Sequence, residues 1–181
     1  MNFYIGDTHF GHENVLKHDS RPFSTVDEMD RELIRYWNAT VTDKDDVYII
    51  GDFAFRNNRP FEWYLKQLKG RKHLIIGNHD DKLVKDEKAM THFVSVDKIT
   101  RINDEGTQIV LCHYPIAEWS GFYHGAHHIY AHIHIQKNEA FNIMKRFDNA
   151  YNAGCMINGY RPVRLSELIQ NNRIYKEQSD C

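Results

Sequence analysis

The sequence predicts an α/β sandwich in one domain that spans residues 1–181. Three short apolar runs that lead into glycine, at 2–6, 46–51 and 73–77, are typical of buried parallel strands. Helical patterns lie between the strands, so strand and helix alternate along the chain. A chain of 181 residues with 41% hydrophobic side chains can bury roughly two-thirds of the surface that it exposes when unfolded. One core is therefore expected.

The first half of the chain begins with a strand at 2–6, followed by a polar loop through Pro22. Thr25, with Glu28 three residues later, has the pattern of a capping box at the start of a helix predicted over 25–39. The apolar residues that recur on one face of this helix are interpreted as core residues. They are Met29, Leu33, Ile34 and Trp37.

Two further strands and a helix complete the first half. A buried strand is predicted at 46–52, and Pro60 then begins an amphipathic helix that ends before Gly70. The next strand, at 73–77, repeats the form of the second. This repetition predicts a parallel arrangement of the strands.

The second half is predicted to be more antiparallel. Residues 92–103 and 107–112 have the pattern of a strand pair, and 129–133 form another short apolar run. A short helix at 166–170 and a last strand at 173–176 complete the expected elements. Ligands of such folds lie in loops beyond the carboxyl ends of strands.

Charge and composition exclude several classes of protein. Because 23 Lys and Arg residues stand against 25 Asp and Glu, with a formal charge of −2, a basic nucleic-acid-binding surface is not expected. No run approaches the roughly 18 apolar residues of a membrane span, and the start lacks a signal-peptide pattern, so a cytoplasmic protein is expected. The three cysteines lack a CxxC pattern, which indicates neither a disulfide framework nor a zinc knuckle. Cys181 is expected to be solvated.

Side chains that can bind metals follow the ends of the expected strands. Residues two apart on an extended segment point the same way, so each of two such pairs can aim two ligands into one pocket. Carboxylate, imidazole and amide groups together suit Mn, Fe, Zn or similar ions, and their number fits two ions. Taken singly, each aspartate and Asn78 could be an ordinary turn residue rather than a metal ligand. Taken singly, His113 would more readily be a core histidine, and His132 with His134 an exposed alternating face, than metal ligands. The set is Asp7, His9, Asp52, Asn78, His79, His113, His132 and His134.

Five short motif blocks occur in order along the chain. They are Asp7-Thr8-His9, Gly51-Asp52, Gly77-Asn78-His79-Asp80, His113, and Ala131-His132-Ile133-His134. In this order they resemble the calcineurin-like metallophosphoesterases, and residues 7–14 resemble a compact bacterial and phage-type branch of that family. The resemblance implies a four-layer α-β-β-α sandwich of two mixed sheets. Ala131 stands where the family usually has glycine, and its methyl group is expected to shift the last strand slightly.

The resemblance also implies seven ligands for two divalent ions, with manganese as the first candidate and iron, zinc or nickel as alternatives. One ion would be bound by Asp7, His9 and His134, the other by Asn78, His113 and His132, with Asp52 bridging both. A hydroxide between the ions would attack the phosphorus of a phosphate ester. His79 would protonate the leaving-group oxygen, and Asp80 would hydrogen-bond the other ring nitrogen of His79. The alternative for Asp80 is a carboxylate at a helix N-terminus.

The implied function is hydrolysis of a phosphomonoester or phosphodiester of a small substrate such as a nucleotide. His12 and Arg56 are candidate substrate contacts, whereas the loop 115–128 could contact substrate or simply cover the core. One alternative is a nuclease of the same fold, which would call for a basic track or an added DNA-binding domain. The other is a non-catalytic metal-binding scaffold, which would be expected to lack ligands. Substrate identity, the physiological metal and the oligomeric state are left open.

Overall fold

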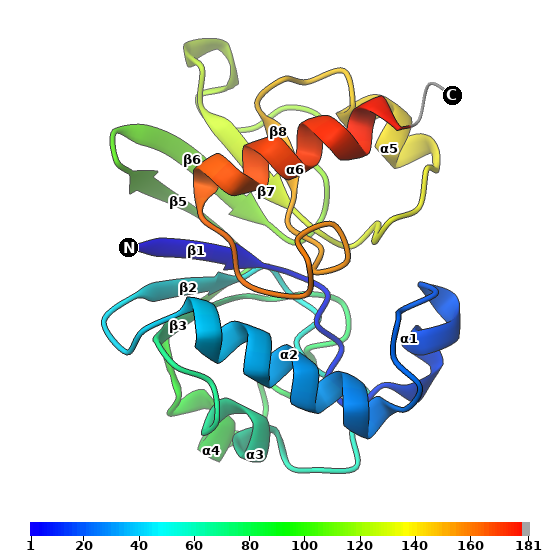
Figure 1. Cartoon of the computed structure of the whole chain (residues 1–181). Coiled ribbons are helices and arrows are strands. Elements are labelled where there is room, and N and C mark those ends of the chain that lie inside the picture. Colours follow the sequence, from blue (N-terminus) through cyan, green and yellow to red (C-terminus); the bar gives the residue numbers. More distant parts are fainter. Residues whose placement is uncertain (179–181) are drawn as a thin grey trace.

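The computed structural model describes residues 1–178 and shows two four-stranded sheets with helices outside them (Figure 1). Cys181 lies outside the described residues. The strands are β1 (Asn2–Ile5), β2 (Asp46–Ile49), β3 (Arg71–Ile75), β4 (Phe93–Asp97), β5 (Ile99–Asp104), β6 (Thr107–Cys112), β7 (His127–Tyr130) and β8 (Ala150–Asn152). The helices are α1 (Glu13–His18), α2 (Val26–Thr40), α3 (Phe61–Leu65), α4 (Glu87–Met90), α5 (Glu139–Met144) and α6 (Leu165–Glu177), with a 3-10 turn at Phe122–His124.

The first sheet has the order β1-β2-β3-β4 and is parallel throughout, as the repeated strand pattern of the first half predicts. An antiparallel bridge between Tyr4 and Val163 adds to its β1 edge. The second sheet has the order β5-β6-β7-β8 and is mixed, because β5 is antiparallel to β6 whereas β7 and β8 are parallel to their neighbours.

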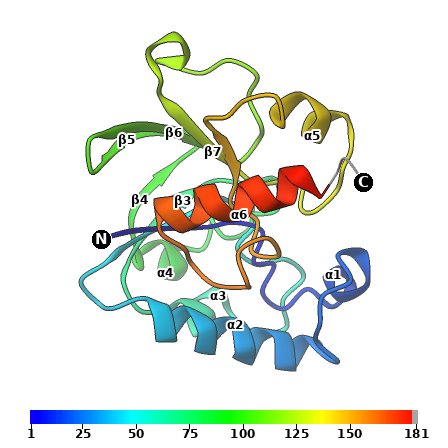
Figure 2. The same cartoon turned by 45° about the horizontal axis from the view of Figure 1, so that its top comes forward.

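Alternate residues of the strands point to opposite faces and divide the core into layers. Phe3 and Ile5 of β1 pack in one buried cluster with α2 and α3, whereas Tyr4 packs in a second cluster with residues of β6. Val110 of β6 faces the other way, into a third cluster that includes residues of α5. In Figure 2, α2 and α5 accordingly lie on opposite sides of the molecule. The predicted four-layer α-β-β-α sandwich is confirmed, but of the two sheets predicted to be mixed only the second is, because β1 to β4 are all parallel.

The helix predicted over 25–39 is confirmed as α2, whose residues run from 26 to 40. The Thr25 side chain accepts a hydrogen bond from the N–H of Glu28 at 3.2 Å, and Glu28 Oε2 accepts one from the N–H of Ser24 at 2.7 Å. These bonds satisfy backbone donors that the first turn of a helix leaves without partners. Leu33 and Trp37 are buried in the same cluster as Phe3 and Ile5, as their spacing predicts.

The predicted strand pair of the second half is confirmed as β5 and β6, but two predictions for this half are wrong, the single strand at 92–103 and the strand at 173–176. The run at 92–103 contains two strands of different sheets, because the chain crosses from β4 to β5 at Lys98. The second sheet is more antiparallel than the first, as predicted, but β7 and β8 are parallel to their neighbours, because the connections 113–126 and 131–149 are long enough for crossovers. Residues 173–176 belong to α6 rather than to a strand, since Leu168, Asn172 and Tyr175 recur at helical spacing and are buried.

Several short elements have no counterpart in the sequence analysis: α1, α4, α5 and β8. Each has six residues or fewer, too few for a clear hydrophobic period. The helix α1 occupies part of the expected polar loop before Pro22. Within residues 1–178, every helix falls short of the length and apolar content that crossing a bilayer requires.

Candidate metal centre

The candidate ligands lie in loops that follow β1, β2, β3, β6 and β7. The first three strands end at the same edge, because Ile5 pairs with Ile49 and Ile49 pairs with Leu74. In the second sheet β6 and β7 are parallel, so the loops after them also leave from one edge. The side chains of loops from both sheets meet there, at the carboxyl ends of the strands.

Four of the predicted ligands form a compact buried group. One ligand atom from each of Asp7, His9, Asp52 and His134 lies within 4.8 Å of the others. The Nε2 atoms of His9 and His134 are 3.3 Å apart, and Nε2 of His9 is 3.6 Å from Oδ2 of Asp52. Two buried carboxylates beside two imidazoles fit a divalent cation, which would offset the cost of burying their negative charge.

The other predicted ligands form a second group that also reaches Asp52. Nε2 of His113 is 3.6 Å from Oδ2 of Asp52 and 3.0 Å from Oδ1 of Asn78. The ring of His132 is 5.1 Å from the ring of His113. Asn78 and His132 are exposed, so this half of the cluster opens to solvent. Asp52 lies within reach of both halves through the same oxygen, which is the position that a bridging ligand requires.

The backbone of several ligands is not extended, although the sequence analysis expected the ligand pairs to lie on extended segments. Among residues 1–178, nine residues other than glycine have positive φ, and six of them are candidate site residues. Such conformations cost roughly 1–3 kcal/mol each and concentrate at functional sites. The alternation of side chains along an extended strand is therefore not what directs Asp7 with His9, or His132 with His134, into the cluster. The six are Asp7, His9, Asp52, Arg56, His132 and His134, with φ between 50° and 70°.

Gly51 and Gly77 of the motif blocks are needed because ligand side chains lie against their backbone. A Cβ atom at Gly77 would lie 2.3 Å from Oδ1 of Asp52, and one at Gly51 would lie 2.3 Å from Nδ1 of His113. Only glycine leaves room for these two ligands to reach the cluster.

The departure at Ala131 is accommodated by a glycine on the facing strand end. The Ala131 methyl group is fully buried, and a Cβ atom at Gly6 would lie only 2.6 Å from it. Because Gly6 has no Cβ, the methyl group fits there. His132 and His134 both keep their places in the cluster.

Hydrogen bonds fix which ring nitrogen two of the histidines present. Nδ1 of His113 is 2.8 Å from the carbonyl oxygen of Ile50, so Nδ1 donates and Nε2 faces Asp52. Nδ1 of His134 is 2.8 Å from both carboxylate oxygens of Asp19, so Nε2 of His134 faces His9. A carboxylate behind a histidine ligand orients the ring and raises its basicity.

Asp19 and Arg21 are functional candidates that the sequence analysis missed. Arg21 forms a buried ion pair with Asp19 at 3.0 Å, and its Nη atoms donate to the carbonyl oxygens of Asp7 at 2.8 Å and Thr8 at 2.9 Å. One guanidinium group thus holds the Asp7 loop and, through Asp19, the ring of His134. No motif marks these residues, because their position follows from α1 and the turn after it.

Asp80 makes other contacts than the predicted one. Its Oδ2 accepts hydrogen bonds from the N–H groups of Asp52 at 2.9 Å and Gly77 at 2.8 Å, and its Oδ1 accepts one from Phe53 at 3.0 Å. This buried carboxylate ties the loop after β2 to the loop after β3. The prediction that Asp80 fixes the tautomer of His79 is corrected to a role in positioning the Asp52 backbone.

His79, His12 and Arg56 lie beside the cluster. The rings of His79 and His12 are 5.5 Å and 5.4 Å from the ring of His9. His79 also packs on Phe55, with ring centroids 4.0 Å apart, and its backbone N–H donates to Oδ1 of Asp52 at 2.9 Å. The Arg56 guanidinium is exposed and lies 5.2 Å from the centroid of the Phe55 ring. These positions leave all three side chains beside the cluster.

The loop 115–128 covers the core. Trp119 packs in the third cluster, which includes residues of α5, and its Nε1 donates to the carbonyl oxygen of Ala126 at 2.8 Å. His128 is buried, with Nδ1 bound to the carbonyl oxygen of Val110 and Nε2 accepting from the N–H of Ile116. Tyr123 is 79% exposed. Of the two alternatives for this loop, these contacts favour the structural one.

Burial shifts the pKa values of the clustered groups in opposite directions. Burial raises the pKa of Asp7 to about 7. The charge of His134 lowers this pKa, and the negative charge of Asp52 raises it. It also raises the pKa of Asp52 and lowers the pKa of His9 and His113. For His134 burial is outweighed by Asp19, whose hydrogen bond and charge raise its pKa. Without a cation these shifts favour the protonated forms of Asp7 and Asp52 and the neutral forms of His9 and His113, whereas His134 favours its protonated form.

These shifts predict that cation binding depends on pH. Below about pH 7 the metal-free protein holds a proton on Asp7 that a metal must displace, whereas above pH 7 it does not. We expect the dissociation constant for Mn²⁺ to rise by about fivefold from pH 7 to pH 6 and to change little above pH 7.5. Isothermal titration calorimetry in buffers of different ionisation enthalpy measures both the affinity and the protons released. An affinity that is constant from pH 6 to 7.5 would contradict this assignment.

The chain matches no family model. It is 30% identical over 183 residues to the uncharacterized protein MJ1445 of Methanocaldococcus jannaschii, an alignment that covers 98% of this chain and 96% of MJ1445. Its structure is similar to that of AQ665 from Aquifex aeolicus, a protein of unknown function, with a TM-score of 0.72 and 25% identity over 94% of this chain and 98% of that chain. A weaker similarity, with a TM-score of 0.45 and 20% identity, covers 74% of this chain and 60% of nuclease MPE from Pseudomonas putida.

The chain belongs to the same family as MJ1445. Its two-sheet sandwich, with the five motif blocks at the carboxyl ends of the strands, is similar to the arrangement that the resemblance to calcineurin-like metallophosphoesterases implies.

Proposed function

We propose that this protein is a binuclear metal-dependent phosphoesterase that hydrolyses an ester of a small substrate. The observation that supports this most strongly is the position of Asp52, whose Oδ2 lies 3.6 Å from both His9 and His113. One carboxylate oxygen between two groups of ligands suits two neighbouring ions. Manganese is the first candidate, and iron, zinc or nickel suit the same oxygen and nitrogen ligands.

The residues of the chain would divide the work as follows. Asp7, His9 and His134 would hold one ion and Asn78, His113 and His132 the other, with Asp52 between them. When bound, such a pair lowers the pKa of a water molecule and neutralises charge on the phosphoryl oxygens. The chain itself supplies orientation through Asp19 and Asp80 and excludes water from the buried half.

His79 would deliver a proton to the leaving-group oxygen. Its ring lies beside His9 but outside the group of ligand atoms, and its contact with Asp52 runs through the backbone N–H. We expect His79→Ala to lower kcat by about 10²- to 10⁴-fold and to leave the metal content unchanged, because the backbone contact survives the substitution. Steady-state kinetics with 4-nitrophenyl esters and metal analysis of the purified variant measure the two quantities.

His92→Ala is the matched control, since His92 lies at the end of α4 and pairs with Glu62 at 3.7 Å. Its activity should equal that of the unchanged protein. If His79→Ala turned over at the normal rate, the proton would have to come from another group, with His12 as the nearest alternative. If His79→Ala lost its metal, His79 would be a ligand.

A further inference from the structure

Two pockets open beside the candidate metal centre and share Asn78 and Asp81. The first, called here the arginine pocket, has a volume of about 210 Å³ and is lined by Phe55, Arg56, His79 and Lys82, among others. The second, called the tyrosine pocket, has a volume of about 530 Å³ and is lined by Ile76, Lys98, Ile99, Cys112 and Tyr114, among others. Because Oδ1 of Asn78 is 3.0 Å from Nε2 of His113, a phosphoryl group at the centre would lie next to both pockets.

The chemistry of the two pockets differs. The arginine pocket is small and carries two cations, Arg56 and Lys82, against one carboxylate, Asp81. In the tyrosine pocket Lys98 and Asp81 balance each other, and most of the other lining side chains are apolar. Its volume lies within the roughly 300–1,000 Å³ typical of pockets for small molecules, whereas the volume of the arginine pocket lies below that range.

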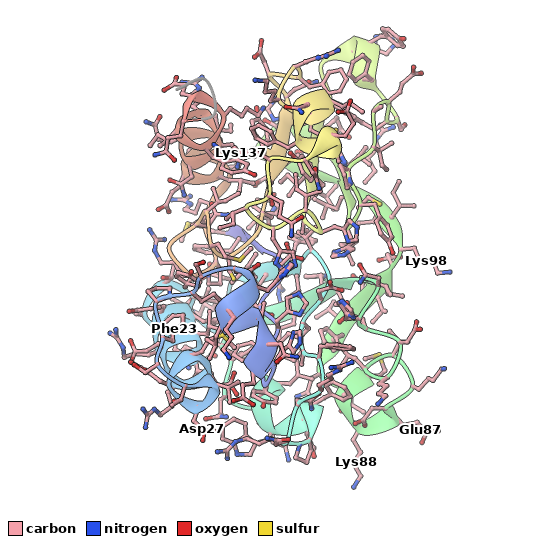
Figure 3. The ribbon with its side chains drawn as sticks, turned by 90° about the vertical axis from the view of Figure 1, so that its right-hand side faces the viewer. Phe23, Asp27, Glu87, Lys88, Lys98 and Lys137 are labelled. Atoms are coloured by element: carbon pink, nitrogen blue, oxygen red, sulfur yellow. The ribbon has the colours of Figure 1, made fainter. Side chains whose placement is uncertain are left out.

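The rim of the tyrosine pocket carries two large apolar side chains that remain in water. Ile99 is 54% exposed and Tyr114 is 45% exposed. The Tyr114 ring is 4.7 Å from the ring of His132 and 5.1 Å from that of His113, so one end of the pocket reaches the proposed ligands. Figure 3 shows Lys98 projecting at the outer edge of the molecule. An aromatic face beside an aliphatic side chain is a surface on which a flat ring can stack.

We propose that the tyrosine pocket binds a flat aromatic substituent of a phosphodiester, namely the substituent that stays on phosphorus. This inference rests on the proposed function and narrows it, because it makes a diester with a ring of about nucleobase size the substrate class. A monoester would leave the pocket empty. The leaving group occupies the arginine pocket, where His79 is placed to protonate its oxygen. Water adds oxygen to phosphorus, the bond to the leaving oxygen breaks, and the ring departs on a phosphomonoester.

Three esters with the same 4-nitrophenolate leaving group test the pocket. They are 4-nitrophenyl phosphate, methyl 4-nitrophenyl phosphate and bis(4-nitrophenyl) phosphate, whose retained substituents are none, a methyl group and a ring. We expect kcat/KM for the bis ester to exceed that for the methyl ester by about tenfold, the effect of one stacking contact. Tyr114→Ala should lower this ratio severalfold, toward the ratio that the two equivalent leaving groups and the greater reactivity of the bis ester give without stacking. Tyr114→Phe, which keeps the ring, should preserve the ratio.

Tyr123→Ala is the matched control, because Tyr123 is an exposed tyrosine outside both pockets. Turnover of the methyl ester reports whether Tyr114→Ala leaves the metal centre intact. Equal kcat/KM for the bis and methyl esters, or a ratio that Tyr114→Ala leaves unchanged, would overturn the pocket assignment and leave the proposed function standing.

A second measurement separates failure of the pocket from failure of the function. If metal-loaded protein cleaves none of the three esters, the proposed function fails, and ¹H–¹⁵N spectra with diphenyl phosphate then decide the pocket. Shifts confined to the amides of Ile99, Tyr114 and their neighbours would support a ring-binding pocket. Spectra without shifts there would overturn it.

Discussion

Replacing Asp52 by asparagine is expected to remove metal-dependent hydrolysis, with kcat/KM lower by about 10³-fold or more. Oδ2 of Asp52 is the atom that lies 3.6 Å from both His9 and His113, so the substitution disturbs both proposed ion positions at once. An amide keeps the size of the side chain but removes its negative charge. Metal analysis of the variant should show fewer ions per chain, and kinetics at saturating metal should show the loss.

Asp43→Asn is the control for this substitution, since Asp43 is an exposed aspartate in the loop before β2. It should leave metal content and activity unchanged. Normal turnover by metal-loaded Asp52→Asn would refute the two-ion arrangement, because Oδ2 of Asp52 is the oxygen that lies 3.6 Å from ring nitrogens of both halves of the cluster.

The second large effect is expected on stability. Asp19→Ala leaves the guanidinium group of Arg21, whose side chain is 0% exposed, without its carboxylate partner. Breaking a buried ion pair from one side typically costs about 3–5 kcal/mol. The free energy of unfolding, measured by urea denaturation in chelator, should fall by about this amount. The affinity for the first metal should also fall by about 10- to 100-fold, because His134 loses the carboxylate that orients it.

The chain contains a matched exposed pair for comparison. Asp27, labelled at the lower edge of Figure 3, is 3.3 Å from Arg59, with side-chain exposures of 72% and 44%. Asp27→Ala should cost less than about 1 kcal/mol. If Asp19→Ala cost no more than Asp27→Ala, the buried pair would not anchor the metal loops. If stability fell but metal affinity stayed the same, Asp19 would serve folding without orienting His134.

Local sequence patterns were sufficient to predict β1, α2, β2, α3 and β3 of the first half. The capping residues of α2 and the glycine that follows each parallel strand act over a few residues, and the structure bears them out. Local patterns were less able to predict how strands that are distant in the sequence pair with each other. Whether β7 pairs in parallel or antiparallel depends on how far the intervening chain travels, and 173–176 is helical because Tyr175 packs on α5.

For the candidate site, too, the sequence predicted what local motifs determine and missed what long-range packing determines. The motif blocks name the side chains that gather at the carboxyl ends of the strands, because each block directly follows a strand. The sequence could not show that Asp7 and His9 adopt positive φ, nor that Arg21 reaches back to their loop. Those features arise from packing between α1, the following turn and the ends of both sheets.

The central claim is that two bound ions make this chain a phosphoesterase. The most direct test is to strip the protein with chelator, add back Mn²⁺ in measured amounts, and follow bound metal and hydrolysis of 4-nitrophenyl esters together. We expect hydrolysis to be absent without metal, to rise as the ions bind, and to reach its limit at two ions per chain. Full activity in chelator, or saturation of the sites without hydrolysis of any ester, would contradict the claim.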